Sequence, residues 1–260
     1  MIKKIIFLLL LICLVCSACT KKQPKTDTLG QIIQRDKLIV GVRDDAAPFG
    51  FRDKNGNLIG YDIELAQNIA KDILGSEKKV EFIPVTASNR IMKLNSGEVD
   101  ILIAAMSITE QRQQILDFSL PYYIAGQAIM VKSNSKMTGL RDFRGKKLII
   151  VFGSTSEGNL QTNVPDVDVI GFKTYNEAYN ALKAGKAEGI VADDTILYRF
   201  AMNDKGVKIL PKRYSQEPYA VALRKEKEST RLLSKIDFII DNLQSSRHLN
   251  QMQKKWKVNY

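Results

Sequence analysis

The chain has 260 residues, of which 45% are hydrophobic and 26% are charged, and its formal net charge is +11. This composition excludes a disordered chain and is typical of a globular protein with a substantial core. A basic surface can favour nucleic acid, anionic lipid or anionic small ligands, whereas positive charges scattered over helix faces indicate only a solvated surface.

The chain begins with the pattern of an export signal. Two lysines precede a continuous apolar run over residues 5–15, which is shorter than a membrane span and typical of the hydrophobic part of a signal peptide. The run ends in CSAC at residues 16–19, which resembles a bacterial lipobox. We therefore expect a signal peptide over 1–18, cleavage before Cys19, and lipidation of Cys19 with palmitate. An ordinary cleaved signal peptide or an uncleaved anchor is the alternative.

Cysteine and histidine content limits the possible chemistry. All three cysteines lie in this leader, so the mature domain has no disulfide, no cysteine-based metal site and no cysteine nucleophile. The single histidine, His248, has no cysteine partner for a zinc site. Walker, dinucleotide-binding and GxSxG motifs are missing, as is a convincing catalytic triad. We expect no metal and no cofactor, and export argues against a nucleic-acid partner.

Strand and helix patterns alternate after a polar stretch, residues 19–34, which we interpret as the lipidated N-terminus and a flexible tether. Strands are expected at 37–42, 80–85 and 99–104, with helices at 62–74 and from Ser88 to Gly97. This β-α-β-α-β order predicts a mostly parallel sheet with helices on its faces.

The α/β pattern then starts again. A strand at 146–152, a loop at 153–157, a helix at 175–184 and a strand at 189–192 are expected in that order. Extended apolar segments at 128–132 and 219–223 would link the two units, and helices over roughly 229–256 would return to the first. We therefore expect an α/β protein with two lobes. Lobe 1 covers 35–128 plus 220–260, lobe 2 covers 133–215, and hinge segments lie at 129–132 and 216–219.

Candidate anion-binding residues follow the expected strand ends. Ligands in open α/β sheets bind outside the carboxyl ends of the strands, and in a two-lobed protein these ends can face one another across a cleft. Arg43, Arg90 and Arg112 lie at such places, and an arginine fork can hold a carboxylate with two parallel hydrogen bonds. Ser107 can share the anion. The alternative is that each arginine pairs with a protein acid, for which the neighbours are Asp44, Asp45 and Glu110.

Other candidates are weaker by themselves. Thr155 lies in a loop whose hydroxyls and amides suit an anion, although such loops commonly cap helices. Asp193, at a strand end, can hold an ammonium group or cap the next helix. Phe49 can pack against the aliphatic part of a ligand or simply lie in the core. Glu157 is the one obvious general acid for an enzyme in this cleft.

Several segments together resemble a known family. They are GVR at 41–43, APFGF at 47–51, GYDIELA at 60–66, GEVD at 97–100, SITEQR at 107–112, DFSLPY at 117–122, GSTSE at 153–157 and ADD at 192–194. In this order they resemble the polar-amino-acid solute-binding proteins of ABC importers, extracellular family 3. The resemblance implies the type II periplasmic-binding-protein fold, in which two α/β lobes joined by two hinge strands close on a ligand. It also implies a monomeric, non-enzymatic protein outside the cytoplasm that delivers its ligand to permease and ATPase subunits.

The resemblance also implies roles for single residues. Arg112 is similar to the arginine that grips the α-carboxylate of the ligand, with help from Ser107 and Thr155, and Asp193 is similar to the acid that accepts the α-ammonium. The segment ending in Arg90 resembles that of glutamate/aspartate binders, in which the arginine holds the side-chain carboxylate. Arg43 has a counterpart in some of the same proteins.

Glutamate or aspartate is therefore the expected ligand. Alanines at 46 and 87 replace aromatics that stack on the ligand in basic-amino-acid binders, which disfavours lysine, arginine and histidine. Glutamine or another polar amino acid is the alternative, because an arginine can also donate to an amide oxygen. A cyclohexadienyl-dehydratase-like enzyme and a receptor or adhesin on the same fold are further alternatives.

Overall fold

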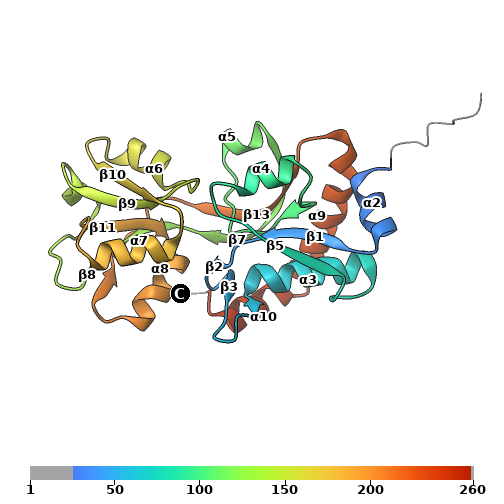
Figure 1. The fold of residues 1–260 in the computed structure, drawn as a ribbon, viewed down its shortest axis with the longest axis horizontal. Coiled ribbons are helices and arrows are strands. Elements are labelled where there is room, and N and C mark those ends of the chain that lie inside the picture. Colours follow the sequence, from blue (N-terminus) through green and yellow to red (C-terminus); the bar gives the residue numbers. More distant parts are fainter. Residues whose placement is uncertain (1–25, 259–260) are drawn as a thin grey trace, which may run out of the picture.

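The protein has two lobes that lie side by side along its long axis, as the computed structural model shows in Figure 1. The structure describes residues 26–258; the expected leader and Cys19 lie outside the described residues. Each lobe contains one five-stranded sheet with helices packed on it, which confirms the two-lobed α/β fold. Within the described part of the chain, no helix is long and apolar enough to cross a membrane.

Lobe 1 is built on a mixed sheet. Its strands are, in spatial order, β5 (Val80–Pro84), β1 (Leu38–Val42), β6 (Ile101–Leu102), β13 (Glu217–Arg224) and β7 (Leu116–Ala125). β1 is parallel to β5 and β6, whereas β13 is antiparallel to β6 and β7. A small second sheet contains β2 (Asp45–Ala46), β3 (Gly50–Arg52) and β4 (Leu58–Ile59).

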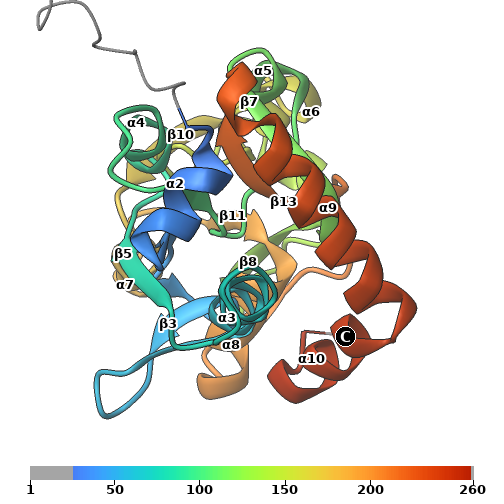
Figure 2. The same cartoon turned by 90° about the vertical axis from the view of Figure 1, so that its right-hand side faces the viewer.

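Helices cover this sheet and continue to the end of the described chain. They are α2 (Thr28–Arg35), α3 (Tyr61–Leu74), α4 (Arg90–Asn95), α5 (Glu110–Gln113), the 3-10 turn η2 (Lys227–Ser229), α9 (Thr230–Ser245) and α10 (His248–Trp256). The expected apolar spacing of α3 places Ile63, Ala66 and Ile69 in the core, and Gly75 ends the helix in a left-handed conformation. Figure 2 shows α9 and α10 together at one side of lobe 1.

Helix α2 corrects the expected length of the tether. Residues 28–34 were expected to be flexible, but they form most of this helix. The Asp27 side chain caps it by accepting a hydrogen bond of 2.8 Å from the backbone amide of Gly30. Leu29 and Ile32 are buried in the core of lobe 1. Burial of this apolar pair holds the segment against the lobe, so a tether can extend only as far as the residue before the helix cap.

Lobe 2 repeats the architecture with a shorter chain. Its sheet has the order β10 (Asp168–Phe172), β9 (Lys147–Val151), β11 (Gly189–Asp193), β8 (Gln127–Lys132) and β12 (Val207–Ile209). β9, β10 and β11 are parallel, and β8 is antiparallel to β11 and β12. The helical elements are η1 (Leu140–Phe143), α6 (Ser156–Asn163), α7 (Tyr175–Lys183) and α8 (Asp194–Asn203).

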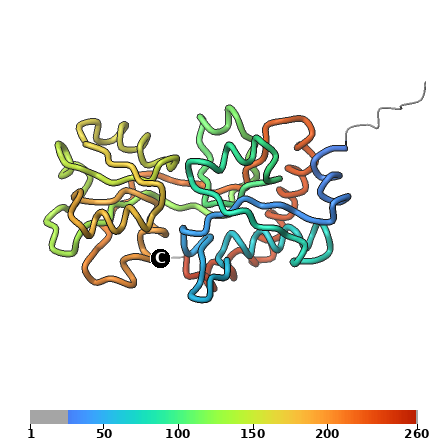
Figure 3. The backbone as a smooth tube through the Cα atoms, viewed as in Figure 1, coloured from blue at the N-terminus to red at the C-terminus, as the bar shows by residue number. Residues whose placement is uncertain are grey.

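The chain passes between the lobes twice, and Figure 3 follows both passages along the backbone. The first is at Gly126, between β7 and β8, and not in the expected segment 129–132. Residues 129–132 are inside β8, where they pair with β11 on one side and β12 on the other. Their apolar character reflects this central position in the lobe 2 sheet. On the return, Glu217 already pairs with Ala125, so the expected segment 216–219 overlaps the start of β13.

Candidate functional site

Buried charges gather where the strand ends of the two lobes face each other. A small cavity there is lined by Arg43, Ala87, Arg90, Ala105, Ser107, Arg112, Ser154, Thr155, Tyr175 and Asp193. Its open space is about 10 Å³, which is room for one water molecule at most. The lobes are therefore closed on one another. Of the seven residues expected to contact a ligand, the cavity brings six together and leaves Phe49 out.

Three larger hollows lie elsewhere on the described surface. They are one of about 670 Å³ beside α7 and β10, one of about 550 Å³ beside β7 and α10, and one of about 460 Å³ beside α7 and α8. None of the three contains the buried arginines or Asp193. We assign the site from its chemistry instead of its size, because buried charged side chains are costly unless they have a partner or a function.

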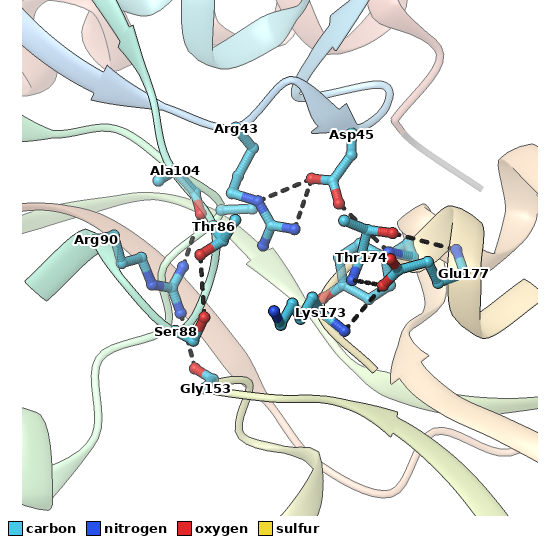
Figure 4. Close-up of polar contacts among 12 residues, drawn as sticks. Arg43, Asp45, Thr86, Ser88, Arg90, Ala104, Gly153, Lys173, Thr174 and Glu177 are labelled. Atoms are coloured by element: carbon cyan, nitrogen blue, oxygen red, sulfur yellow. Dashed lines mark hydrogen bonds and ion pairs between the residues drawn. The ribbon is translucent and has the colours of Figure 1, made fainter. Parts of the chain in front are cut away.

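Arg43 follows β1 and is already paired. Its side chain is 2% exposed, and its Nε and Nη2 donate to Oδ1 of Asp45 at 2.9 and 2.5 Å. The other oxygen of Asp45 accepts from the backbone amide of Tyr175, at the start of α7 in lobe 2, at 3.3 Å. The guanidinium carbon of Arg43 is 5.2 Å from the centre of the Tyr175 ring. Figure 4 shows Asp45 between Arg43 and this segment of lobe 2. Of the alternatives open from the sequence, pairing with a neighbouring acid applies to Arg43.

Arg90 begins α4 and has no carboxylate within hydrogen-bonding distance among the described residues. It donates from Nη1 to the carbonyl of Ala104 at 2.8 Å and from Nη2 across the cleft to the carbonyl of Gly153 at 3.2 Å. Its Nε has no hydrogen-bond partner in the described part of the chain. Burial lowers the pKa of Arg90 to about 9, and the positive charge of Arg112 adds to this effect. This guanidinium therefore has the greatest need of a further acceptor.

Arg112 reaches the same carbonyl from α5. Its Nη1 donates to the carbonyl of Ser107 at 2.8 Å, and its Nη2 donates to the carbonyl of Gly153 at 3.1 Å. The Thr109 hydroxyl caps the short helix by accepting from the amide of Arg112. Burial lowers the pKa of Arg112, while the charge of Asp193 opposes that effect. Two arginines of lobe 1 thus hold one backbone oxygen of lobe 2.

Gly153 makes this close contact between the lobes possible. Its φ is +79°, and a Cβ atom there would lie 2.4 Å from the carbonyl oxygen of Ala87 in lobe 1. Any other residue would combine left-handed backbone strain with a clash against backbone. The glycine in the expected anion-binding loop is therefore explained by closure of the lobes.

Asp193 is the acid of the cavity. It ends β11, is 6% exposed, and accepts a hydrogen bond from the hydroxyl of Tyr219. It occupies the N-cap position of α8 but makes no capping bond to that helix with its side chain. Burial raises the pKa of Asp193 to about 7, and the negative charge of Glu217 acts in the same direction. An ammonium group beside it would lower this pKa again.

Thr155 belongs to a hydrogen-bond network that the sequence did not indicate. Its hydroxyl donates to Glu217 at 2.9 Å and accepts from the Nε2 of Gln127 at 2.8 Å. Glu217 is buried at the start of β13 and also accepts from Asn159 at 2.9 Å. Because the hydroxyl proton of Thr155 points to Glu217, this hydroxyl does not donate to a ligand carboxylate in this arrangement, which differs from its expected role.

Three further residues differ from expectation. The Phe49 ring is fully buried in lobe 1, with Tyr219 at 5.1 Å and Tyr123 at 5.2 Å between ring centres, so it packs in the core and not on the cavity. Glu157 is exposed in the first turn of α6 and does not line the cavity. Tyr175 lines the cavity although the sequence marked it only as a helix start.

A second buried acid, Asp62, lies behind the arginines. It accepts from the hydroxyl of Tyr122 at 2.9 Å and from the amide of Ala105 at 2.8 Å. Burial raises its pKa to about 7, and the positive charges of Arg90 and Arg43 partly oppose that rise. Lobe 1 therefore has a second titratable carboxyl close to the arginines Arg90 and Arg43.

Comparison with known proteins gives a consistent result. The family described as bacterial extracellular solute-binding proteins, family 3, matches residues 38–259. The chain is 38% identical to the glutamine-binding protein of an ABC transporter of Bacillus subtilis, over 90% of this chain and 86% of that protein. It is 40% identical to a glutamine-binding protein of Geobacillus stearothermophilus, over 80% of each. An ancestral arginine-binding protein solved with glutamine has a TM-score of 0.79 and 40% identity, covering 86% of this chain and 99% of that one.

Likeness to glutamate/aspartate binders is weaker than expected. The glutamate/aspartate import solute-binding protein of Salmonella typhimurium is 26% identical, over 89% of this chain and 80% of that protein. The chain therefore has more in common with these two glutamine-binding relatives than with the class expected from the segment around Arg90.

Proposed function

Because the chain belongs to family 3 of the bacterial extracellular solute-binding proteins, we propose that it captures free glutamine between its lobes and delivers it to an ABC importer. The observation that carries this proposal is the placing of Arg112 and Asp193 on opposite lobes, both facing one cavity. An α-amino acid is a zwitterion, and these two residues match its carboxylate and its ammonium group. Closure of the lobes would complete both contacts together.

Arg90 is the residue proposed to read the ligand side chain. Its fork lacks a carboxylate partner among the described residues, so it can donate either to the amide oxygen of glutamine or to the carboxylate of glutamate. Glutamine stands first because relatives at 38% and 40% identity are glutamine-binding proteins. Glutamate or aspartate is the second candidate, and the uncompensated charge of Arg90 is the observation that favours it.

Binding is favoured over catalysis at this site. A dehydratase would need a general acid in the cavity. Glu157, the candidate from the sequence, is exposed and does not line the cavity. Asp193, the acid that does line it, is assigned here to the ammonium group of the ligand. We therefore propose a protein that binds its ligand and leaves it unchanged. Incubation with prephenate or arogenate, followed by a search for aromatic product, checks this; product formation would contradict it.

Membrane attachment completes the proposed function. Lipidation of Cys19 would hold the folded body outside the cytoplasm near permease and ATPase subunits, and the segment before α2 would act as the tether. Palmitate labelling of the wild-type protein and of Cys19→Ser in the bacterium tests this. We expect label only in the wild type; equal labelling of the variant would place the lipid elsewhere.

A thermal-shift screen of residues 26–260 against the amino acids tests the ligand. A ligand at 100 times its Kd adds about 2.7 kcal/mol to the free energy of unfolding. We expect the largest shift with glutamine, and Arg90→Ala should bring glutamine and other polar amino acids closer together in affinity. Arg52→Ala, a surface change in the same lobe, is the control. No shift with any amino acid would overturn the proposed function.

A further inference from the structure

The cavity contains one arginine that is neutralised and two that are not. Arg43 and Asp45 form an ion pair with side-chain exposures of 2% and 12%. Among residues 26–258, Arg90 and Arg112 donate to backbone carbonyls and to no carboxylate. Asp45 thus offsets the positive charge of Arg43 although Asp45 itself does not line the cavity.

Asp45 occupies one of the two edges by which Arg43 can grip a carboxylate. Both the Nε and the Nη2 of Arg43 donate to the same oxygen of Asp45. These two groups form one edge of the guanidinium fork, the geometry by which arginine holds a carboxylate in a bidentate way. A carboxylate of a ligand that approached Arg43 would meet this edge already occupied and a negative charge beside it.

The second oxygen of Asp45 links this pair to closure of the lobes. It accepts from the backbone amide of Tyr175, the first residue of α7, at 3.3 Å. Asp45 belongs to lobe 1 and Tyr175 to lobe 2, so both oxygens have partners in the closed arrangement. The N-terminus of a helix favours a negative charge. In the closed arrangement, the contact with Tyr175 therefore fixes the position of Asp45, and Asp45 in turn fixes the position of Arg43.

We propose that Asp45 is a specificity-determining residue that makes the cavity prefer an uncharged amide side chain over a carboxylate. This inference rests on the proposed function, in which the cavity takes a polar amino acid. Neutralising Arg43 leaves Arg90 as the cation available to the ligand side chain. Arg90 alone can hold a neutral oxygen acceptor, whereas a second unpaired cation beside it would favour a buried carboxylate more strongly.

Asp45→Asn tests the role of the charge with little change in shape. The amide oxygen can still accept from Arg43 or Tyr175, but the negative charge is removed. We expect the ratio of glutamate affinity to glutamine affinity, measured by calorimetry, to rise about tenfold or more. Asp45→Glu keeps the charge and should keep the ratio near that of the wild type.

Asp44→Asn is the matched control. Asp44 precedes Asp45 in the chain, but it is 34% exposed and pairs with Arg52 at 3.2 Å on the surface. The same change of formal charge there should alter the ratio by less than about twofold, because solvent screens exposed charges. Equal shifts in Asp44→Asn and Asp45→Asn would overturn the proposal, since net charge alone would then explain them.

Folding of the variant is checked by circular dichroism and thermal unfolding. If Asp45→Asn does not fold, Arg43→Gln is compared with the double variant Arg43→Gln/Asp45→Asn. The ratio of glutamate affinity to glutamine affinity should be higher in the double variant than in Arg43→Gln. A wild type that binds glutamine, together with unchanged ratios in these variants, overturns the role of Asp45 but leaves the proposed function standing. A wild type that binds no amino acid overturns the proposed function itself.

Discussion

The two walls of the cavity have opposite chemistry. Lobe 1 contributes three arginines, each held by acceptors of its own lobe: Asp45, the carbonyl of Ala104 and the carbonyl of Ser107. Lobe 2 contributes mainly acceptors, among them the carboxylate of Asp193 and the carbonyl of Gly153. The wall of lobe 1 thus carries mainly donors and that of lobe 2 mainly acceptors, although Asp45 of lobe 1 accepts from the amide of Tyr175 in lobe 2.

This division matches the direct contacts between the two lobes. Donors of lobe 1 and acceptors of lobe 2 satisfy one another directly, as Arg90 and Arg112 do with Gly153. An amino acid has an acceptor end and a donor end, so it can insert between the walls with its carboxylate toward lobe 1 and its ammonium toward lobe 2. The predictions below test whether the two walls have these separate roles.

Removing Arg112 should have the largest effect. Arg112→Ala deletes the donor proposed for the α-carboxylate, which every amino acid carries. A charge-assisted bidentate contact in a buried site corresponds to a loss of about 100-fold or more in affinity. Calorimetry with glutamine and glutamate measures it, and Arg52→Ala is the control on the surface of the same lobe. Affinity within about threefold of the wild type would remove Arg112 from this role.

A methyl group at Gly153 should separate the walls. In Gly153→Ala the new Cβ meets the Ala87 carbonyl oxygen at 2.4 Å, so the lobes cannot approach as closely. We expect affinity to fall about 30-fold, since both arginines lose their optimal distance to lobe 2. Gly97→Ala is the matched control, because Gly97 has a φ of +78° but nothing within 4 Å of its Cβ position.

The control separates backbone strain from the clash between lobes. Both variants should lose about 1 kcal/mol of stability from the positive φ, measured by urea unfolding. Only Gly153→Ala should also weaken binding. Equal affinities of the two variants would show that closure does not depend on the contact with Ala87.

The acceptor wall should make binding depend on pH. Asp193 must be charged to hold an ammonium group, and burial raises its pKa to about 7 in the protein without ligand. Bound ammonium lowers that pKa, so affinity is full above pH 7 and falls about tenfold for each pH unit below it. Asp193→Asn should bind weakly and lose this pH dependence. A profile that is flat between pH 5 and 8 in the wild type would contradict the role of Asp193.

The smallest expected effect on affinity comes from removing a tyrosine hydroxyl, and it distinguishes the buried acids Asp193 and Asp62. Tyr219→Phe removes the hydroxyl that donates to Asp193 and lowers its pKa. Its loss should raise that pKa further, so affinity at pH 7 should fall about threefold and the midpoint of the profile should move to higher pH. Tyr122→Phe removes the equivalent hydrogen bond to Asp62 in lobe 1. It should leave the midpoint where it is, and a shift as large as that of Tyr219→Phe would assign the titration to Asp62.

The regular elements of both lobes follow from local patterns in the sequence. Apolar runs bounded by polar loops predicted β1, β9 and β11, and the spacing of α3 placed its buried face. The predicted ends of strands and helices were less accurate, because they depend on hydrogen bonds to other segments. The expected strand over 99–104 is only Ile101–Leu102, because only this part is paired along the ladder. The expected cap at Ser88 is replaced by Asn89 one residue later.

Site residues that lie at strand ends could be predicted from the sequence. Contacts between segments that are distant in the sequence could not. Arg90, Arg112 and Asp193 follow from their positions after strands or at helix starts. The sequence offered two acids next to Arg43, Asp44 and Asp45, but the choice of Asp45 depends on its pairing in the small sheet of β2 and β3. Glu217 joins Thr155 from 62 residues away, and no local pattern indicates such a contact.

The place of β13 in lobe 1 governs the order in which the molecule can assemble. This strand lies between β6 and β7, yet it comes after all of lobe 2 in the chain. Lobe 2 is uninterrupted from β8 to β12, so its sheet can form from neighbouring segments as the polypeptide emerges. The sheet of lobe 1 lacks one interior strand until residues 217–224 have been added to the chain. The wall of the cavity that carries the three arginines therefore belongs to a sheet that is complete only after the whole of lobe 2 has been synthesised.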